Sequence, residues 1–154
     1  IFVFYFSLFA VIATIQSTPF LNMIAEWVSS QKDNPLMLII IFSTTTTLVT
    51  AIVSAGPSTV VLLPVALQIA DLYPPNMVIA CFALSICAGS SIFTFSATAG
   101  PLVQSLSEKY KLTVEGKPLS FGFKEYFVPG LMGGLIIYLV NLIYIFINLK
   151  SITL

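Results

Sequence analysis

The sequence interrupts a long apolar run with GSSIFTFSATAGP, residues Gly89 to Pro101. Glycine, proline and hydroxyl side chains crowd this stretch, although no charged residue occurs between Leu72 and Ser107. A helix that breaks inside such a charge-free region exposes backbone N–H and C=O groups that lipid cannot satisfy. The break is therefore tolerated only where it is buried in protein or lines a water-filled cavity, which makes it the first indication of function.

A second break, SAGPST at 54–59, lies within the charge-free stretch from Asn34 to Ala70. The two apolar arms around it are either a pair of full spans joined by a tight turn or a hairpin whose tip stops inside the membrane. Paired broken helices mark the substrate site in many secondary transporters. The alternative is a pair of ordinary kinks, in which the hydroxyl groups bond back to their own helices.

The composition excludes a soluble globular domain. Of the 154 residues, 58% are hydrophobic and 8% are charged, whereas soluble domains carry about 25% charged residues. Four charge-free stretches are each long enough for the roughly 20 residues of a membrane helix, so at least four membrane-embedded segments are expected. The six basic residues are all lysine and the formal net charge is zero, so no basic stripe is available for nucleic acid.

The chain is predicted to form one transmembrane domain over residues 1–154, as the C-terminal half of a larger protein. Its first residue is Ile1, inside an apolar run, so we expect further sequence upstream. The predicted segments are a membrane helix at 1–15, an interfacial helix at 19–30, a helical hairpin at 36–72, a broken helix at 76–107, a loop at 108–125 and a last membrane helix at 126–149.

Orientation is predicted from the loop at 108–125, which carries four lysines. Loops rich in lysine favour the cytoplasmic side, so this loop is expected to be cytoplasmic and the C-terminus extracytoplasmic in a multi-pass cell-membrane protein. Gly130 and Gly134 have the G-x-x-x-G spacing that allows close helix packing. Asn141 is expected to bond across helices, and most of the run from Thr44 to Thr47 is expected to bond back to the backbone.

The hairpin tip has the chemistry of an ion site. A half-helix that starts near Ser58 aims unpaired N–H groups and a partial positive charge at whatever lies before it, so a carboxylate is held without arginine. Freed carbonyls and the hydroxyls of Ser54, Ser58 and Thr59 are hard oxygen donors suited to sodium, and no other metal site is expected. Histidine is absent and the acids lie in loops or turns, so no nucleophile and base can be paired and an enzyme is not expected.

From Leu36 onward the order of these features resembles the C-terminal repeat of the ion transporter superfamily, which includes divalent-anion sodium symporters, gluconate permeases, and arsenite and sodium/proton antiporters. SAGPSTVVLLPVA, from Ser54 to Ala66, is similar to the tip and second arm of that family's hairpin, without the asparagine of its Ser-Asn-Thr form. AGSSIFTFSATAGP, from Ala88 to Pro101, is similar to its unwound helix, and FKEYFVPG at 123–130 to its amphipathic lead-in.

The resemblance implies an all-α polytopic membrane protein, the second of two inverted repeats, in which a re-entrant helical hairpin and a discontinuous transmembrane helix meet at the midplane. Its expected partners are the lipid bilayer and the N-terminal half of the same transporter, and a homodimer is left open. The implied substrate and ion ligands are Ser54, Gly56, Pro57, Ser58 and Thr59 at the tip and Ser90, Ser91, Thr94, Ser96 and Thr98 at the break.

The predicted function is secondary transport of a small organic anion by symport with sodium or protons, with no cofactor other than this coupling ion. One alternative is a sodium/proton or anion antiporter of the same fold. Another is a non-transporting structural subunit, in which the breaks are kinks and the G-x-x-x-G face docks a partner.

Overall fold

The computed structural model describes most of the chain from residue 34 onward. The described ranges are 34–97, 100–110, 113–114, 117–118 and 123–150, with the single residues Ala10, Ala13, Thr14, Pro19, Met23, Glu26 and Ser30. The membrane helix predicted at 1–15 and the interfacial helix predicted at 19–30 lie outside these continuous ranges.

The described chain is mainly helical, with one short β-ribbon and connecting turns and loops. The helices are α3 (Pro35–Val53), α4 (Ala55–Ala70), α5 (Pro75–Ile92), α6 (Gly100–Tyr110) and α7 (Phe123–Lys150), and strands β1 (Thr113–Val114) and β2 (Lys117–Pro118) pair antiparallel. By length and composition, α3, α5 and residues 125–148 of α7 are each able to cross a membrane, whereas α4 is a shorter apolar helix. The prediction of a mainly helical protein with helices able to span a membrane is confirmed, and the inverted repeat and the re-entrant hairpin stay predictions.

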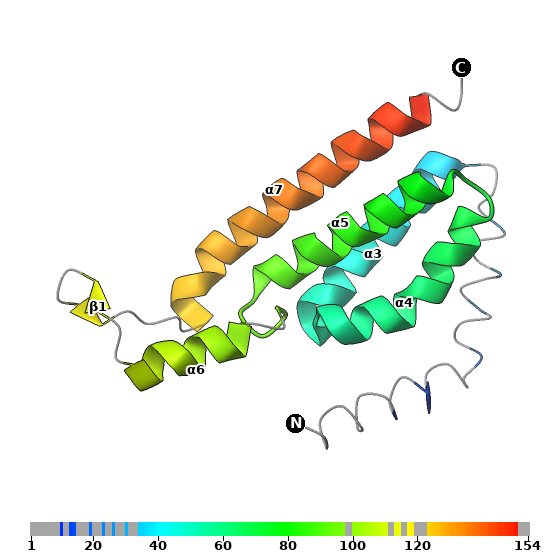
Figure 1. Cartoon of the computed structure of the whole chain (residues 1–154). Helices are drawn as coiled ribbons and strands as arrows, with labels where there is room; N and C mark the ends of the chain where they lie inside the picture. The colour runs from blue at the N-terminus through cyan, green and yellow to red at the C-terminus, as the bar shows by residue number, and fades with distance from the viewer. Residues whose placement is uncertain are drawn as a thin grey trace.

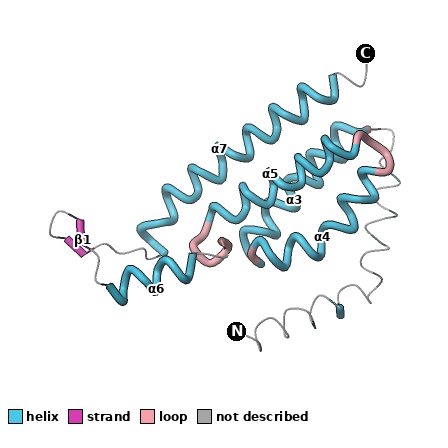
Figure 2. Tube along the Cα trace, viewed as in Figure 1, coloured by secondary structure: helices cyan, strands magenta, loops and turns pink. Residues whose placement is uncertain are grey.

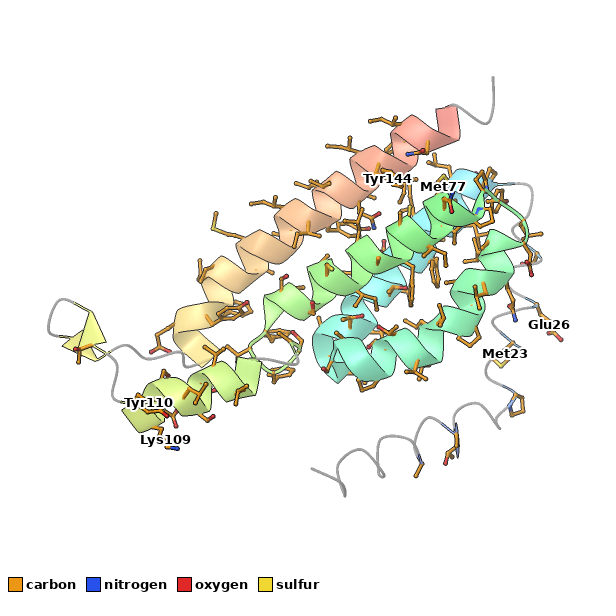
Figure 3. The ribbon with its side chains drawn as sticks, in the orientation of Figure 1. Met23, Glu26, Met77, Lys109, Tyr110 and Tyr144 are labelled. Carbon is orange, nitrogen blue, oxygen red and sulfur yellow. The ribbon has the colours of Figure 1, made fainter. Side chains whose placement is uncertain are left out.

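The helices run alternately toward two ends of a bundle (Figure 1). The start of α3, the turn between α4 and α5, and the end of α7 share one end, while α6, the ribbon and the start of α7 lie at the other. In Figure 3, Met77 and Tyr144 mark the first end, and Lys109 and Tyr110 the second. The Asp71 turn and the loop predicted at 108–125 therefore face opposite ways, and which of them is cytoplasmic stays a prediction.

Helix α5 is the centre of the bundle, because α3, α4 and α7 all pack against it. Proline occupies the first turn of both α3 and α5, where its missing N–H costs nothing and its fixed φ suits the helix. The apolar core gathers toward the end of the bundle that holds the 71–74 turn, and Phe42 stacks on Phe82 there with ring centroids 5.9 Å apart. Its buried members are Leu38, Ile39, Phe42, Leu62, Val65, Ala66, Ile69, Met77, Val78, Cys81, Phe82 and Ile145.

Glycines bring the helices together toward the other end. A Cβ added to Gly134 would lie 2.8 Å from the Ala88 carbonyl oxygen, and one added to Gly130 would lie 2.6 Å from that of Ser91. A Cβ on Gly89 would collide with the Thr47 carbonyl of α3. The G-x-x-x-G motif is thus used for packing of α7 on α5 within the chain.

Polar contacts join α7 to its neighbours halfway along. The Asn141 side-chain amide donates to Ser85 Oγ at 2.9 Å and to the Cys81 carbonyl at 3.3 Å, which is the cross-helix role predicted for it. The Tyr138 and Thr44 hydroxyls share a hydrogen bond between α7 and α3. Such bonds add to the close packing that holds membrane helices together, where lipid supplies no hydrophobic drive.

Adjacent glycines on α7 provide a test of this packing. We expect Gly134→Ala to cost about 1–3 kcal/mol, because its methyl group must displace α5 backbone atoms. Gly133→Ala is the matched control, since an added Cβ there meets nothing within 4 Å, and it should leave the melting temperature unchanged or slightly raised. Thermal unfolding of the full-length protein in detergent measures both, and equal effects would show that α7 is packed otherwise.

Candidate functional site

The chain reverses direction at a single residue, Ser54, because α3 ends at Val53 and α4 begins at Ala55. Ser54 has φ 92° and ψ 156°, a backbone region used almost only by glycine, and such strain costs about 1–3 kcal/mol. Two hydrogen bonds hold it in place: its N–H donates to the Thr50 carbonyl at 3.0 Å, and its carbonyl accepts the Ser58 N–H at 3.2 Å. The predicted break at 54–59 is therefore a sharp, strained corner.

The second break begins where α5 ends at Ile92, and residues 93–97 form a loop before α6. The Ser96 side chain closes the end of α5: its hydroxyl lies 2.7 Å from the Phe93 carbonyl oxygen, 3.1 Å from that of Ser90 and 3.3 Å from that of Gly89. The same oxygen accepts the Phe93 N–H at 3.1 Å. Ser96 is fully buried, so it satisfies backbone groups that the loop would otherwise leave unpaired.

The two breaks meet through the main chain. The Ala55 N–H, at the start of α4, donates to the Ser96 carbonyl at 3.1 Å, and Figure 2 shows the loop after α5 beside the corner between α3 and α4. In the first turn of α4, the Ser58 backbone N–H donates to the Ser54 carbonyl, and Pro57 has no N–H. Among the described residues, no backbone bond of the Gly56 N–H to another element is found, as is usual for the first N–H groups of a helix.

The tip residues differ in how free their polar groups are. Gly56 is exposed, and a Cβ added to it would meet nothing within 4 Å. The Ser58 side chain is only 1% exposed, and its hydroxyl finds no partner in the described part of the chain. Thr59 donates its hydroxyl to the Ala55 carbonyl at 2.7 Å, and Pro57 is half-buried.

The hydroxyls predicted at the second break are mostly engaged. Ser90 and Ser91 both donate to the Cys87 carbonyl of their own helix, at 3.1 and 2.7 Å, as the kink alternative expects. Thr94 is buried in the loop, and Thr98 lies outside the described residues. Of the five residues predicted here, the structure brings Ser96 into contact with the tip.

Sequence reasoning missed a row of hydroxyls on α3. Ser43, Thr46 and Thr50 are fully buried, and their side-chain oxygens have no partner among the described residues. Their spacing of three and four residues places them on one face of the helix. In the threonine run, Thr44 and Thr47 bond back to the Ile40 and Ser43 carbonyls as predicted, whereas Thr46 does not.

The described residues contain no group of three or more His, Cys, Asp and Glu side chains that could hold a metal ion. An ion at the tip would therefore be bound by neutral oxygens. No protein family, curated protein or solved structure matches this chain, so the resemblance to the ion transporter superfamily stays a prediction.

The strain at Ser54 is testable by removing its Cβ. We expect Ser54→Gly to raise the free energy of unfolding by about 1 kcal/mol, because relief of the backbone strain outweighs the added freedom of the unfolded chain. Ser54→Ala keeps the Cβ and should bring no such gain. If melting of the full-length protein in detergent gives the same temperature for both variants, Ser54 is not strained.

The closing role of Ser96 predicts a structural cost. Ser96→Ala should lower the free energy of unfolding by about 1–3 kcal/mol, since it leaves buried backbone groups unpaired. Ser90→Ala removes an exposed hydroxyl from a helix interior and should cost much less. Melting temperatures of the two variants test this role of Ser96. A lower melting temperature for Ser90→Ala than for Ser96→Ala would refute it.

Proposed function

We propose that this chain provides one wall of the substrate site of an ion-coupled secondary transporter that moves a small organic anion. The observation that supports this most is the hydrogen bond between Ala55 and Ser96, which joins two helix breaks. Non-helical backbone at membrane depth is tolerated only where it is buried or lines a wet cavity. Two such segments in contact favour a common site over two separate kinks.

The start of α4 suits the anion. Its first turn presents the Gly56 N–H, and the space over Gly56 is open. The aligned peptide dipoles place a partial positive charge at this end of the helix. A carboxylate can be bound there by N–H donors, as at other helix N-termini.

Neutral oxygens suit sodium as the coupling ion. Ser58 at the tip and Thr50, one turn before the corner, carry buried hydroxyls without partners in the described chain, and hard oxygens of this kind are ligands for sodium. A proton needs a titratable carrier, but the described acids nearest in sequence, Asp71 and Glu108, are exposed and lie toward the ends of the bundle. We therefore favour sodium over protons.

A re-entrant hairpin is part of this proposal. Helix α3 has 19 residues, so it is about 28 Å long and nearly matches a hydrocarbon core of about 30 Å. Its tip stays inside the core if the hairpin is tilted or if Asn34 and Pro35 begin among the headgroups. Figure 1 shows α6 continuing past the corner of the hairpin, which is consistent with a crossing completed by α6 and a second wall supplied by an inverted repeat.

The structural-subunit alternative assumed that the G-x-x-x-G face of α7 binds a partner protein. Gly130 and Gly134 on this face already lie against α5, so the face is not open to a partner there. Antiport on the same fold remains the other outcome of the transport measurement. That measurement distinguishes symport from antiport, because it shows whether a sodium or proton gradient drives carboxylate uptake or ion exchange.

Uptake by the full-length protein in proteoliposomes, with labelled carboxylates and an imposed sodium or proton gradient, tests the proposal. We expect sodium-driven uptake that Ser58→Ala lowers about tenfold, the cost of one hydrogen bond to a charged ligand. Its fold should survive, since the lost hydroxyl has no hydrogen-bond partner among the described residues. Ser91→Ala is the matched control and should have little effect, because that hydroxyl is engaged within α5.

Other results would count against the proposal. Equal loss in both variants would remove the tip from the site. Sodium/proton exchange without carboxylate uptake would establish antiport instead.

A further inference from the structure

Helix α6 differs from the other described helices in how it is covered. Among the described elements, α3, α4 and α7 pack against α5, whereas α6 has no comparable packing against another helix. Figure 1 shows it extending past the corner of the hairpin, at the end of the bundle where α7 begins. With 11 residues it is about 16 Å long, so it is too short to cross a hydrocarbon core of about 30 Å by itself.

The apolar and polar side chains of α6 lie on different sides of the helix. The apolar ones, which we call the apolar stripe, fall within about 100° of the helix circumference. All four are exposed: Leu102 (59%), Val103 (44%), Leu106 (40%) and Tyr110 (64%). The remaining sides carry the polar residues Gln104, Ser105, Ser107, Glu108 and Lys109. A helix divided in this way is suited to a boundary between an apolar and an aqueous phase.

The polar side of α6 favours water over another helix or lipid. Gln104 Nε2 donates to Glu108 Oε1, one turn further on, at 3.2 Å. Ser107 is buried, and the exposed members of this side are Ser105, Glu108 and Lys109. Charged side chains stay in water unless a partner compensates for their burial, so this side cannot lie against acyl chains.

Charges begin in the last turn of α6. No charged residue occurs from Leu72 to Ser107, and Glu108 and Lys109 then follow. At the same end of the bundle, the part of α7 that is able to cross a membrane begins at Glu125. Charges on α6 and on α7 therefore mark one level, where hydrocarbon gives way to headgroups and water.

The last two residues of α6 have the side chains typical of a headgroup layer. Tyrosine is enriched at membrane–water interfaces. The Lys109 ammonium lies 5.6 Å from the centroid of the Tyr110 ring, within the range of a cation–π interaction. A lysine placed in this way covers apolar surface with its methylene groups and keeps its charge in water. Figure 3 shows both side chains at the end of α6 that lies away from the hairpin.

We propose that α6 is an interfacial helix whose partner is the phospholipid bilayer. It lies obliquely at the headgroup level, where it completes the crossing begun by α5, with the apolar stripe on the acyl chains and Gln104 and Glu108 toward water. A protein partner would also cover the stripe, but it would not explain why charges begin at one level on both α6 and α7. The inference goes beyond the proposed transport function and does not depend on it.

Spin labels on single cysteines test the inference in the full-length protein, reconstituted in vesicles of phosphatidylcholine and phosphatidylglycerol. All native cysteines, Cys81 and Cys87 included, are first replaced by alanine. We expect the label of Leu106→Cys to collide with oxygen, which concentrates in lipid, and to lie about 5–10 Å below the headgroups. The label of Gln104→Cys should collide mainly with a water-soluble nickel chelate.

The position of Gln104 makes the comparison decisive, because in an upright helix it would lie deeper in the membrane than Leu106. Ile143→Cys, at a 58% exposed position inside α7, is the reference for the hydrocarbon core. Melting temperatures of the labelled variants in detergent should match that of the cysteine-free protein.

Three results would overturn the inference. Equal access of the chelate to the labels at 104 and 106 would place α6 in water. Access of neither probe to the label at 106 would show that protein covers the apolar stripe. Oxygen access at 104 and 106 equal to that at 143 would place α6 upright in the hydrocarbon. None of these results depends on uptake, so the transport proposal is tested separately.

Discussion

The hydrogen bond from the Ala55 amide to the Ser96 carbonyl joins the two places where the helical backbone is interrupted. A peptide group that leaves a helix inside a bilayer must find its partner in the protein or in water, because lipid offers none. Each interruption answers this need partly by itself: Ser54 bonds to both arms of the hairpin, and the Ser96 hydroxyl closes the end of α5. The bond from Ala55 to Ser96 adds one partner to each interruption, so it ties the corner of the hairpin to the loop.

The two ends of the bundle are stabilised by different means. Large apolar side chains such as Leu38, Ile69 and Phe82 fill the end that holds the 71–74 turn. Toward the interruptions, Gly89 and Gly134 permit close backbone approach in place of large side chains. Hydroxyl groups can remain unpaired there only if other oxygens, waters or ions meet them, since a buried unpaired group costs about 1–3 kcal/mol. The unpaired hydroxyls of Thr50 and Ser58 lie beside the corner of the hairpin, at this end of the bundle.

Charge-free runs and proline positions predicted the helices well, because they report physical limits on any chain in a bilayer. The hairpin predicted at 36–72 appears as α3 and α4, and the last helix predicted at 126–149 appears as α7 from Phe123 to Lys150. The fate of each hydroxyl could not be predicted in the same way. Ser91 and Ser96 lie in the same hydroxyl-rich stretch, and the sequence gives no reason to expect different roles for them. Ser91 lies in a helix and bonds to the backbone of that helix, whereas Ser96 lies in a loop that folds back over α5. Thr47 bonds to the Ser43 carbonyl, whereas the hydroxyl of the neighbouring Thr46 has no partner among the described residues, since successive residues face different sides of a helix. The contact of Phe93 with Phe127 joins elements far apart in the chain, and no local pattern encodes it.

If the hairpin tip binds an anion as proposed, the lack of a charged side chain among its described residues sets a condition on that binding. The helix dipole and a few N–H groups offset only part of the cost of removing a carboxylate from water. Sodium faces the same difficulty at neutral hydroxyl oxygens such as those of Ser58 and Thr50. When both ions are bound close together, their mutual attraction is strong in a region of low dielectric, and it offsets the remaining cost only if further hydrogen bonds satisfy both ions. In the proposed transporter, neither ion would then be bound tightly alone and the pair would be bound together, so coupling of the two fluxes would follow from the absence of charge among the described residues of the tip.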